Sequence, residues 1–203
     1  MTDRRRRGWG ETYLPRRAGA QRRCHAGEVM QSVELLLDDA LDAAVREEWR
    51  LLADAGLPSQ ARHTGPTNAP HVTLAVAAAL SPAAEARLVN TVTDELPSLT
   101  LGGLLVFPGH VLARVVVPSA ALLDLHARVI VAVGDEDGVV EHVHPGAWTP
   151  HVTLARRLGP DDLASAVRLL ADAPRERTGR AAAVRRWDPR VRRAWTVSPD
   201  ARA

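Results

Sequence analysis

The hexapeptide PHVTLA occurs twice in this sequence, at residues 70–75 and 150–155, and each copy contains one histidine. The ordinary pKa of a histidine side chain is about 6.5, so both of its protonation states are available near neutral pH. Two imidazoles can therefore act on one substrate as general base and general acid. His71 and His151 are the first candidates for catalytic residues.

Each histidine is followed two positions later by a threonine, Thr73 or Thr153. Successive side chains of a β-strand point to opposite faces, so each histidine shares a face with its threonine, while the valine and leucine of the motif point into the core. Threonine hydroxyls can hydrogen-bond the non-bridging oxygens of a tetrahedral anion. If the two copies face each other across a cleft, these residues suit cleavage of a phosphodiester without a metal. The motifs are identical, so which histidine is the acid stays open.

The repeated pattern extends well beyond the hexapeptide. Residues 71–118 and 151–199 each predict a strand, a helix and two further strands, and they end on the similar segments VLARVVVP and VRRAWTVSP. Two copies favour a closed pair of related lobes over a solenoid.

Hydrophobic periodicity, helix caps and turn residues predict the individual elements. Strands are expected at 31–38, 71–77, 99–107, 110–117, 151–157, 177–187 and 191–197. Helices are expected at 38–56, 81–96, 119–134 and 159–173.

The HVTL segments at 71–74 and 151–154 resemble the paired His-x-Thr-x (HxTx) signatures of the two-histidine (2H) phosphoesterase superfamily, which includes 2′,5′-RNA ligases and cyclic phosphodiesterases. The order of elements from about 30 to 199 resembles that family too. The resemblance implies an α+β fold, a bilobal duplication with two antiparallel sheets flanking a central groove and helices outside.

The same resemblance implies that His71 and His151 are the catalytic histidines and that Thr73 and Thr153 bind the phosphate. It predicts a metal-independent phosphodiesterase with no cofactor, acting on a 2′,3′-cyclic phosphate or a 2′,5′-linked phosphodiester of RNA ends or nucleotides. Two alternatives stay open: a non-catalytic module that binds RNA ends or a phosphorylated ligand, and a reversible 2′,5′-RNA ligase.

Two further residues are candidates for substrate binding. Trp148 lies three residues before His151 and can stack on a base at the mouth of the groove, with packing in the core as the alternative. Arg157 has the strand parity of His151, but a rise of about 3.3 Å per residue puts it roughly 20 Å away. It is expected to contact a distant part of the substrate or to lie on a solvated rim.

The segment EHVH at 141–144 raises the alternative of a zinc site, because His142 and His144 share a face if the segment is extended. No further ligand occurs at a fixed spacing, so loop histidines are the favoured interpretation and no metal site is predicted.

Charge and composition set the remaining expectations. All 26 basic residues are arginines. Residues 1–23 contain eight of these arginines and only two acidic residues, so the rest of the chain is mildly acidic although the whole chain has a net charge of +2. Residues 1–29 are interpreted as a disordered basic leader or an over-extended start, and 30–203 as a single bilobal domain. Cys24 has no partner for a disulfide, and no apolar run is long enough for a membrane span. A cytoplasmic monomer is expected.

Overall fold

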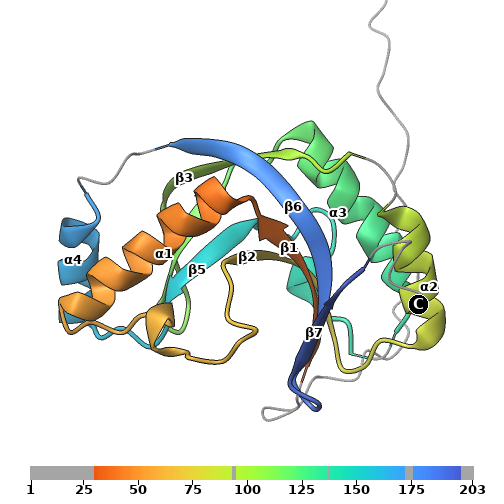
Figure 1. Ribbon diagram of the computed structural model, residues 1–203, viewed down its shortest axis with the longest axis horizontal. Helices are drawn as coiled ribbons and strands as arrows, with labels where there is room; N and C mark the ends of the chain where they lie inside the picture. The colour runs from red at the N-terminus through yellow and green to blue at the C-terminus, as the bar shows by residue number, and fades with distance from the viewer. Residues whose placement is uncertain (1–29, 93–94, 137, 172–175, 198–203) are drawn as a thin grey trace, which may run out of the picture.

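The computed structural model describes residues 30–92, 95–136, 138–171 and 176–197 (Figure 1), and the leader predicted at 1–29 lies outside these parts of the chain. Within them, seven strands form one sheet in the order β1-β2-β5-β4-β3-β6-β7. The strands are β1 (Gln31–Leu37), β2 (His71–Ala77), β3 (Ser98–Phe107), β4 (Val111–Val116), β5 (His151–Ala155), β6 (Arg177–Asp188) and β7 (Arg193–Thr196). All of their pairings are antiparallel.

The structure has a single sheet, whereas the sequence predicted two. The long strand β6 is the main reason, because it pairs with two different strands along its length. Residues 177–180 of β6 pair with β3, whereas residues 181–187 pair with β1. A second connection joins β2 to β5 at Val72 and Val152. The pairings therefore run in a ring from β1 through β2, β5, β4 and β3 to β6 and back to β1. The prediction of an α+β fold is confirmed.

The helices are α1 (Asp39–Asp54), α2 (Pro82–Thr91), α3 (Ala120–Val133) and α4 (Pro160–Leu169), with short 3₁₀ helices η1 (Gln60–Arg62) and η2 (Glu141–Val143). Capping side chains set where three of them begin. Asp38, Ser81 and Ser119 each accept a hydrogen bond from a backbone N–H of the first turn, which otherwise has no partner within the helix. Helix α2 ends before the predicted residue 96, at the β-branched Thr91 and Val92, whose helix propensity is low.

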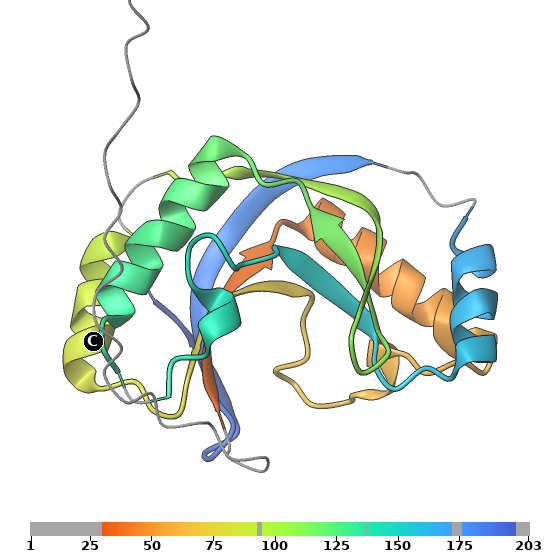
Figure 2. The ribbon, with the colours of Figure 1, turned by 180° about the vertical axis from the view of Figure 1, so that it is seen from behind.

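The sheet arches between two groups of helices. Figures 1 and 2 show α1 and α4 at one end of the molecule, and α2 packed beside α3 at the other. The apolar residues of both hexapeptides enter the core, where Val72, Leu74, Val152 and Leu154 are fully buried. No helix in the described residues is both long and apolar enough to span a membrane.

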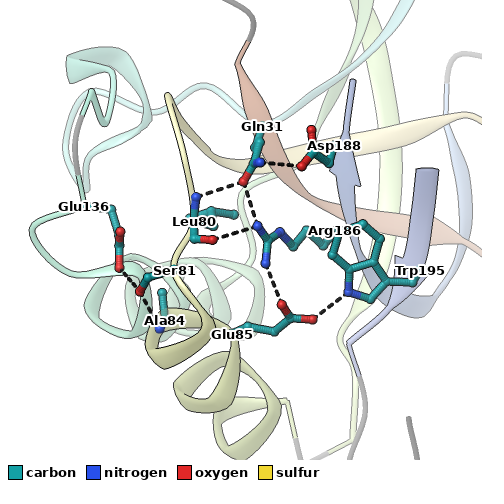
Figure 3. A network of polar contacts seen from close by, with 9 residues as sticks. All are labelled: Gln31, Leu80, Ser81, Ala84, Glu85, Glu136, Arg186, Asp188 and Trp195. Carbon is teal, nitrogen blue, oxygen red and sulfur yellow. Dashed lines mark hydrogen bonds and ion pairs between the residues drawn. The ribbon is translucent and has the colours of Figure 1, made fainter. Parts of the chain in front are cut away.

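A polar network fixes α2 to the sheet (Figure 3). The buried Arg186 of β6 donates hydrogen bonds to Glu85 of α2 at 2.5 Å, and to Gln31 and the Leu80 carbonyl at 2.7 Å each. The indole of Trp195 in β7 donates to the other oxygen of Glu85 at 2.6 Å. Because buried polar groups are costly without partners, these bonds specify how α2 sits against β6 and β7.

Candidate active site

Strands β2 and β5 bring the two hexapeptides together at the centre of the sheet. Their one assigned pair joins Val72 to Val152, and the strands run antiparallel. The polar side chains on either side of this pair therefore lie on one face of the sheet, opposite to the face that carries the buried valines.

The four polar residues of the motifs are all half-buried, in alternation with the buried valines and leucines. The antiparallel direction sets His71 next to Thr153, and His151 next to Thr73, so the two histidines occupy diagonal corners. The positive charge of His71 is one of the smaller causes that lower the pKa of His151.

Both imidazole rings are held by the same kind of hydrogen bond. The Nδ1 atom of His71 lies 2.7 Å from the carbonyl oxygen of Ala69, and Nδ1 of His151 lies 2.8 Å from that of Thr149. A carbonyl oxygen only accepts, so Nδ1 carries the proton in both rings and donates it. This fixes the tautomer and leaves Nε2 as the atom that accepts or donates a proton towards a substrate.

Within the described parts of the chain, His71 has a carboxylate beside it and His151 does not. Oε1 of Glu34 in β1 lies 3.6 Å from Nε2 of His71, and a β-bulge between Val33 and Glu34 adjusts the direction of that side chain. Burial by itself raises the pKa of Glu34. The charges of His71 and Arg185, and hydrogen bonds at 2.7 Å from Ser32 Oγ and Arg185 Nε, outweigh burial and hold the pKa below its ordinary value. Glu34 is therefore ionised at neutral pH.

His151 has different surroundings. Its ring lies against the ring of Phe107, with centroids 4.4 Å apart. Burial is the largest cause that lowers the pKa of His151, and the positive charges of Arg156, His71 and His142 lower it further. The neutral ring is favoured, and the same positive surroundings favour an anion bound between the histidines.

Two tryptophan indoles hold the backbone of the motifs. The Nε1 atom of Trp148 donates to the carbonyl of Thr73 at 2.9 Å, and Nε1 of Trp49 donates to the carbonyl of Thr153 at 3.0 Å. Beyond the one assigned pair, Val72 and Val152, strands β2 and β5 no longer pair with each other. The carbonyl of each threonine accepts a hydrogen bond from an indole there instead. The same kind of contact supports both halves of the site.

Residues 37–190 match the sequence profile of the 2′-5′ RNA ligase superfamily. The chain belongs to this superfamily. The resemblance to the 2H phosphoesterases that the two HVTL segments indicated is thereby confirmed.

Solved structures similar to this superfamily member include Escherichia coli LigT in its apo form, with 15% identity, a TM-score of 0.49, and coverage of 84% of this chain and 98% of LigT. Kluyveromyces marxianus Usb1 has 14% identity and a TM-score of 0.48, with coverage of 84% and 98%. A structure described as a phosphoesterase has 15% identity and a TM-score of 0.49, with coverage of 84% and 99%. No curated protein sequence matches the chain.

The surroundings of the two weaker substrate-binding candidates agree with the alternatives given for them, core packing for Trp148 and a solvated rim for Arg157. One face of the Trp148 ring stacks on the buried His126, at 3.8 Å between centroids and 4° between planes, and its N–H is used by Thr73. We therefore interpret Trp148 as a support of β2. Strand β5 ends at Ala155 instead of residue 157, and Arg157 is an exposed residue with a left-handed φ of 60°. The parity argument fails for Arg157 because it is not part of the strand.

The EHVH segment does not form an extended strand. Glu141–Val143 is the 3₁₀ helix η2, so the shared face that a zinc site at His142 and His144 required is lost. Among the described residues, no group of three or more His, Cys, Asp or Glu side chains is arranged to hold a metal ion.

Sequence reasoning missed Glu34 and Arg185. A signal existed, because Glu34 is the acidic residue in the otherwise apolar stretch VELLL, and a carboxylate buried in a strand needs a charged partner. The identity of that partner depends on β1 lying between β2 and β6, which local patterns do not reveal.

Proposed function

We propose that this member of the 2′-5′ RNA ligase superfamily is a phosphodiesterase that hydrolyses a 2′,3′-cyclic phosphate or a 2′,5′-linked phosphodiester of an RNA end or nucleotide. The observation that carries the proposal is the matched pair of histidines: His71 and His151 each use Nδ1 on a backbone carbonyl and keep Nε2 for the substrate. Thr73 and Thr153 lie beside them on the same face and supply hydroxyl donors to the phosphate oxygens.

The surroundings of the two rings support different roles. Burial and nearby positive charges lower the pKa of His151, so its neutral Nε2 serves as the general base. Oε1 of the ionised Glu34 lies 3.6 Å from Nε2 of His71 and gives this histidine, unlike His151, a carboxylate partner, so we assign the general acid to His71.

In the proposed reaction, a water oxygen attacks phosphorus and its proton passes to Nε2 of His151. The bond from phosphorus to the leaving oxygen breaks, and that oxygen takes the proton from Nε2 of His71. The products are a phosphate monoester and an alcohol, which for a 2′,3′-cyclic phosphate are the 2′-phosphate and 3′-hydroxyl of one ribose. Proton exchange with water restores both histidines. General acid and general base each contribute about 10²- to 10⁴-fold to such reactions.

Hydrolysis of the four nucleoside 2′,3′-cyclic monophosphates by the full chain, with EDTA present, tests the proposal. We expect release of 2′-phosphates, with a loss of about 10²-fold or more in the His71→Ala and His151→Ala variants. Undiminished turnover by both variants would contradict it.

The two alternatives give different results in the same experiment. A binding module would bind the nucleotides without turnover, and a ligase would join RNA ends when product is in excess. The ligase assay is included because the superfamily is named for 2′-5′ RNA ligases and because ligation, the reverse reaction, would use the same two histidines.

A further inference from the structure

A third histidine, His126 of α3, is buried outside the two motifs and is only 2% exposed. A polar side chain at such a position needs a hydrogen-bond partner. Its Nε2 atom lies 2.8 Å from the carbonyl oxygen of Val143, and a carbonyl only accepts, so Nε2 carries the proton and donates it. Burial is the largest cause that lowers the pKa of His126, although the bond to Val143 opposes it. The neutral ring is therefore favoured.

The ring of His126 also sets the orientation of Trp148. The two rings are stacked, with 3.8 Å between centroids and 4° between planes. Trp148 is only half-buried, so packing against the core does not by itself fix the plane of its indole. The torsion that turns an aromatic ring has a broad energy profile, so a stacked neighbour decides its angle.

His126 thereby holds the segment 141–148 at two points. This segment contains η2 and a turn that is closed by backbone hydrogen bonds. His126 binds its beginning through the carbonyl of Val143 and its end through the ring of Trp148. The second hexapeptide follows directly, so the segment connects α3 to one of the two motifs.

The same part of the chain contacts the first hexapeptide. The Nε1 atom of Trp148 donates to the carbonyl of Thr73 at 2.9 Å. The backbone N–H of Val140, just before η2, donates to the carbonyl of Val76 in β2 at 3.2 Å. A hydrogen bond weakens steeply as its angle closes, so an indole that turns loses its bond to Thr73. The plane of the Trp148 ring therefore links His126 to the motif of β2.

The other motif does not need such a partner. Trp49, which donates to the carbonyl of Thr153, is only 3% exposed, and the core holds its ring on all sides. Trp148 lacks this degree of burial. The stacked ring of His126 supplies the constraint that the core supplies to Trp49.

We propose that His126 is a positioning residue for phosphodiester hydrolysis: its ring fixes the Trp148 indole, which in turn holds Thr73 and the motif of β2 in place. The inference rests on the proposed function, because its first readout is turnover. His126 acts through Trp148, so loss of its ring should lower kcat and leave KM nearly unchanged.

Two variants of His126 separate the ring from its N–H group. His126→Gln keeps an N–H donor for the carbonyl of Val143 but removes the ring. We expect kcat for adenosine 2′,3′-cyclic phosphate to fall by about tenfold, with KM changed by less than about twofold. His126→Phe keeps a ring that stacks on Trp148 but leaves the carbonyl without a donor. We expect it to unfold at a lower urea concentration and to keep kcat within about threefold of the wild type.

A double-mutant cycle tests whether the effect passes through the indole. In the Trp148→Phe variant the N–H group that binds Thr73 is already missing, so His126→Gln should lower kcat by less than about twofold further. Trp195→Phe is the matched control, because it also removes an indole N–H bond, to Glu85 at 2.6 Å, but outside the motifs. In that background His126→Gln should have its full effect.

Exchange of the indole N–H of Trp148 with solvent, measured by NMR, does not depend on turnover. The resonance is identified by its absence from the spectrum of Trp148→Phe. Loss of one net hydrogen bond corresponds to a factor of about two to ten, so we expect exchange in His126→Gln to be faster by that factor than in the wild type or in His126→Phe.

The failures of the two proposals are distinguishable. If the wild-type chain hydrolyses no cyclic phosphate, the phosphodiesterase function is refuted, and the exchange measurement still tests whether His126 fixes the indole. The positioning proposal alone is refuted if folded His126→Gln retains the wild-type kcat, or if its effect is equally large in the Trp148→Phe background. Unchanged exchange of the Trp148 N–H in His126→Gln would refute it as well.

Discussion

Removal of the two indole donors that hold the motif strands should reduce catalysis more than binding. Trp49 and Trp148 donate to the carbonyls of Thr153 and Thr73 at 3.0 and 2.9 Å, at the place where β2 and β5 separate. Trp49→Phe and Trp148→Phe keep an aromatic ring but delete the N–H group. The strands can then relax, and with them the histidine and threonine side chains of the motifs.

The magnitude follows from the burial of each indole. Leaving a buried carbonyl without its donor costs about 1–3 kcal/mol. Trp49 is only 3% exposed, so its replacement also leaves a cavity, and we expect Trp49→Phe to lower the free energy of unfolding by about 2–4 kcal/mol. Trp148 is half-buried, so water can partly replace its N–H, and we expect a loss of about 1–2 kcal/mol.

Urea unfolding and steady-state hydrolysis of a 2′,3′-cyclic phosphate measure the two effects separately. A displacement of about 1 Å in a catalytic group can cost up to 10²-fold, so we expect kcat to fall by about tenfold or more, with KM changed by less than about twofold. The control is Trp195→Phe, which deletes an indole bond of 2.6 Å to Glu85, outside the motifs (Figure 3).

The control should lose stability and retain kcat. If Trp148→Phe retains the wild-type kcat in folded protein, or if Trp195→Phe lowers kcat equally, the indoles do not position the motifs and our reasoning is wrong.

Three further predictions concern pH and the capping of α1. Because burial lowers the pKa of His151, its neutral form should persist below pH 6.5, so the acidic limb of the kcat/KM profile should fall only as the pH drops through that lowered pKa. An acidic limb with its midpoint at or above pH 6.5 would contradict this. The pKa of Glu34 is also lowered, so its ionised side chain contributes to the free energy of unfolding above pH 4.5, and this contribution is lost as the pH falls through the folded-state pKa. In urea unfolding from pH 6 to pH 3, the free energy of unfolding of Glu34→Gln should therefore depend less on pH than that of the wild type. Asp38 accepts hydrogen bonds from the N–H groups of Leu41 at 2.9 Å and Arg180 at 2.6 Å, so Asp38→Ala should cost about 1–2 kcal/mol in the same assay and Asp38→Asn much less.

The elements of the fold could be predicted from sequence because their signals are local. Strand β2 has the predicted bounds of 71–77, since alternation begins directly after Pro70 and the motif itself alternates. The helix predicted at 81–96 begins as expected, because Ser81 and Pro82 form a standard start. The shared face of each histidine and threonine follows from the same period of two.

The arrangement of those elements could not be predicted in the same way, because it depends on contacts between distant segments. Strand β6 changes partner from β3 to β1 along its length, and nothing within residues 177–188 signals this. The contact between Glu34 and His71 requires β1 to lie beside β2. The prediction extended strand β5 to Arg157, although the strand ends at Ala155 and Arg157 has a left-handed φ. No glycine or proline at that position signals the change of backbone conformation.

The strand outside the repeats explains how identical motifs acquire different surroundings. Thr73 of β2 pairs with Glu34 of β1, and Thr153 of β5 pairs with Ala113 of β4, so one motif lies beside a carboxylate where the other lies beside a methyl group. Strand β1 precedes both repeats, whereas β4 belongs to the first of them. A duplication of the repeat alone would give two equivalent histidines. The added strand supplies the charge that separates an acid from a base, and with β6 it forms one wall of a pocket beside His71.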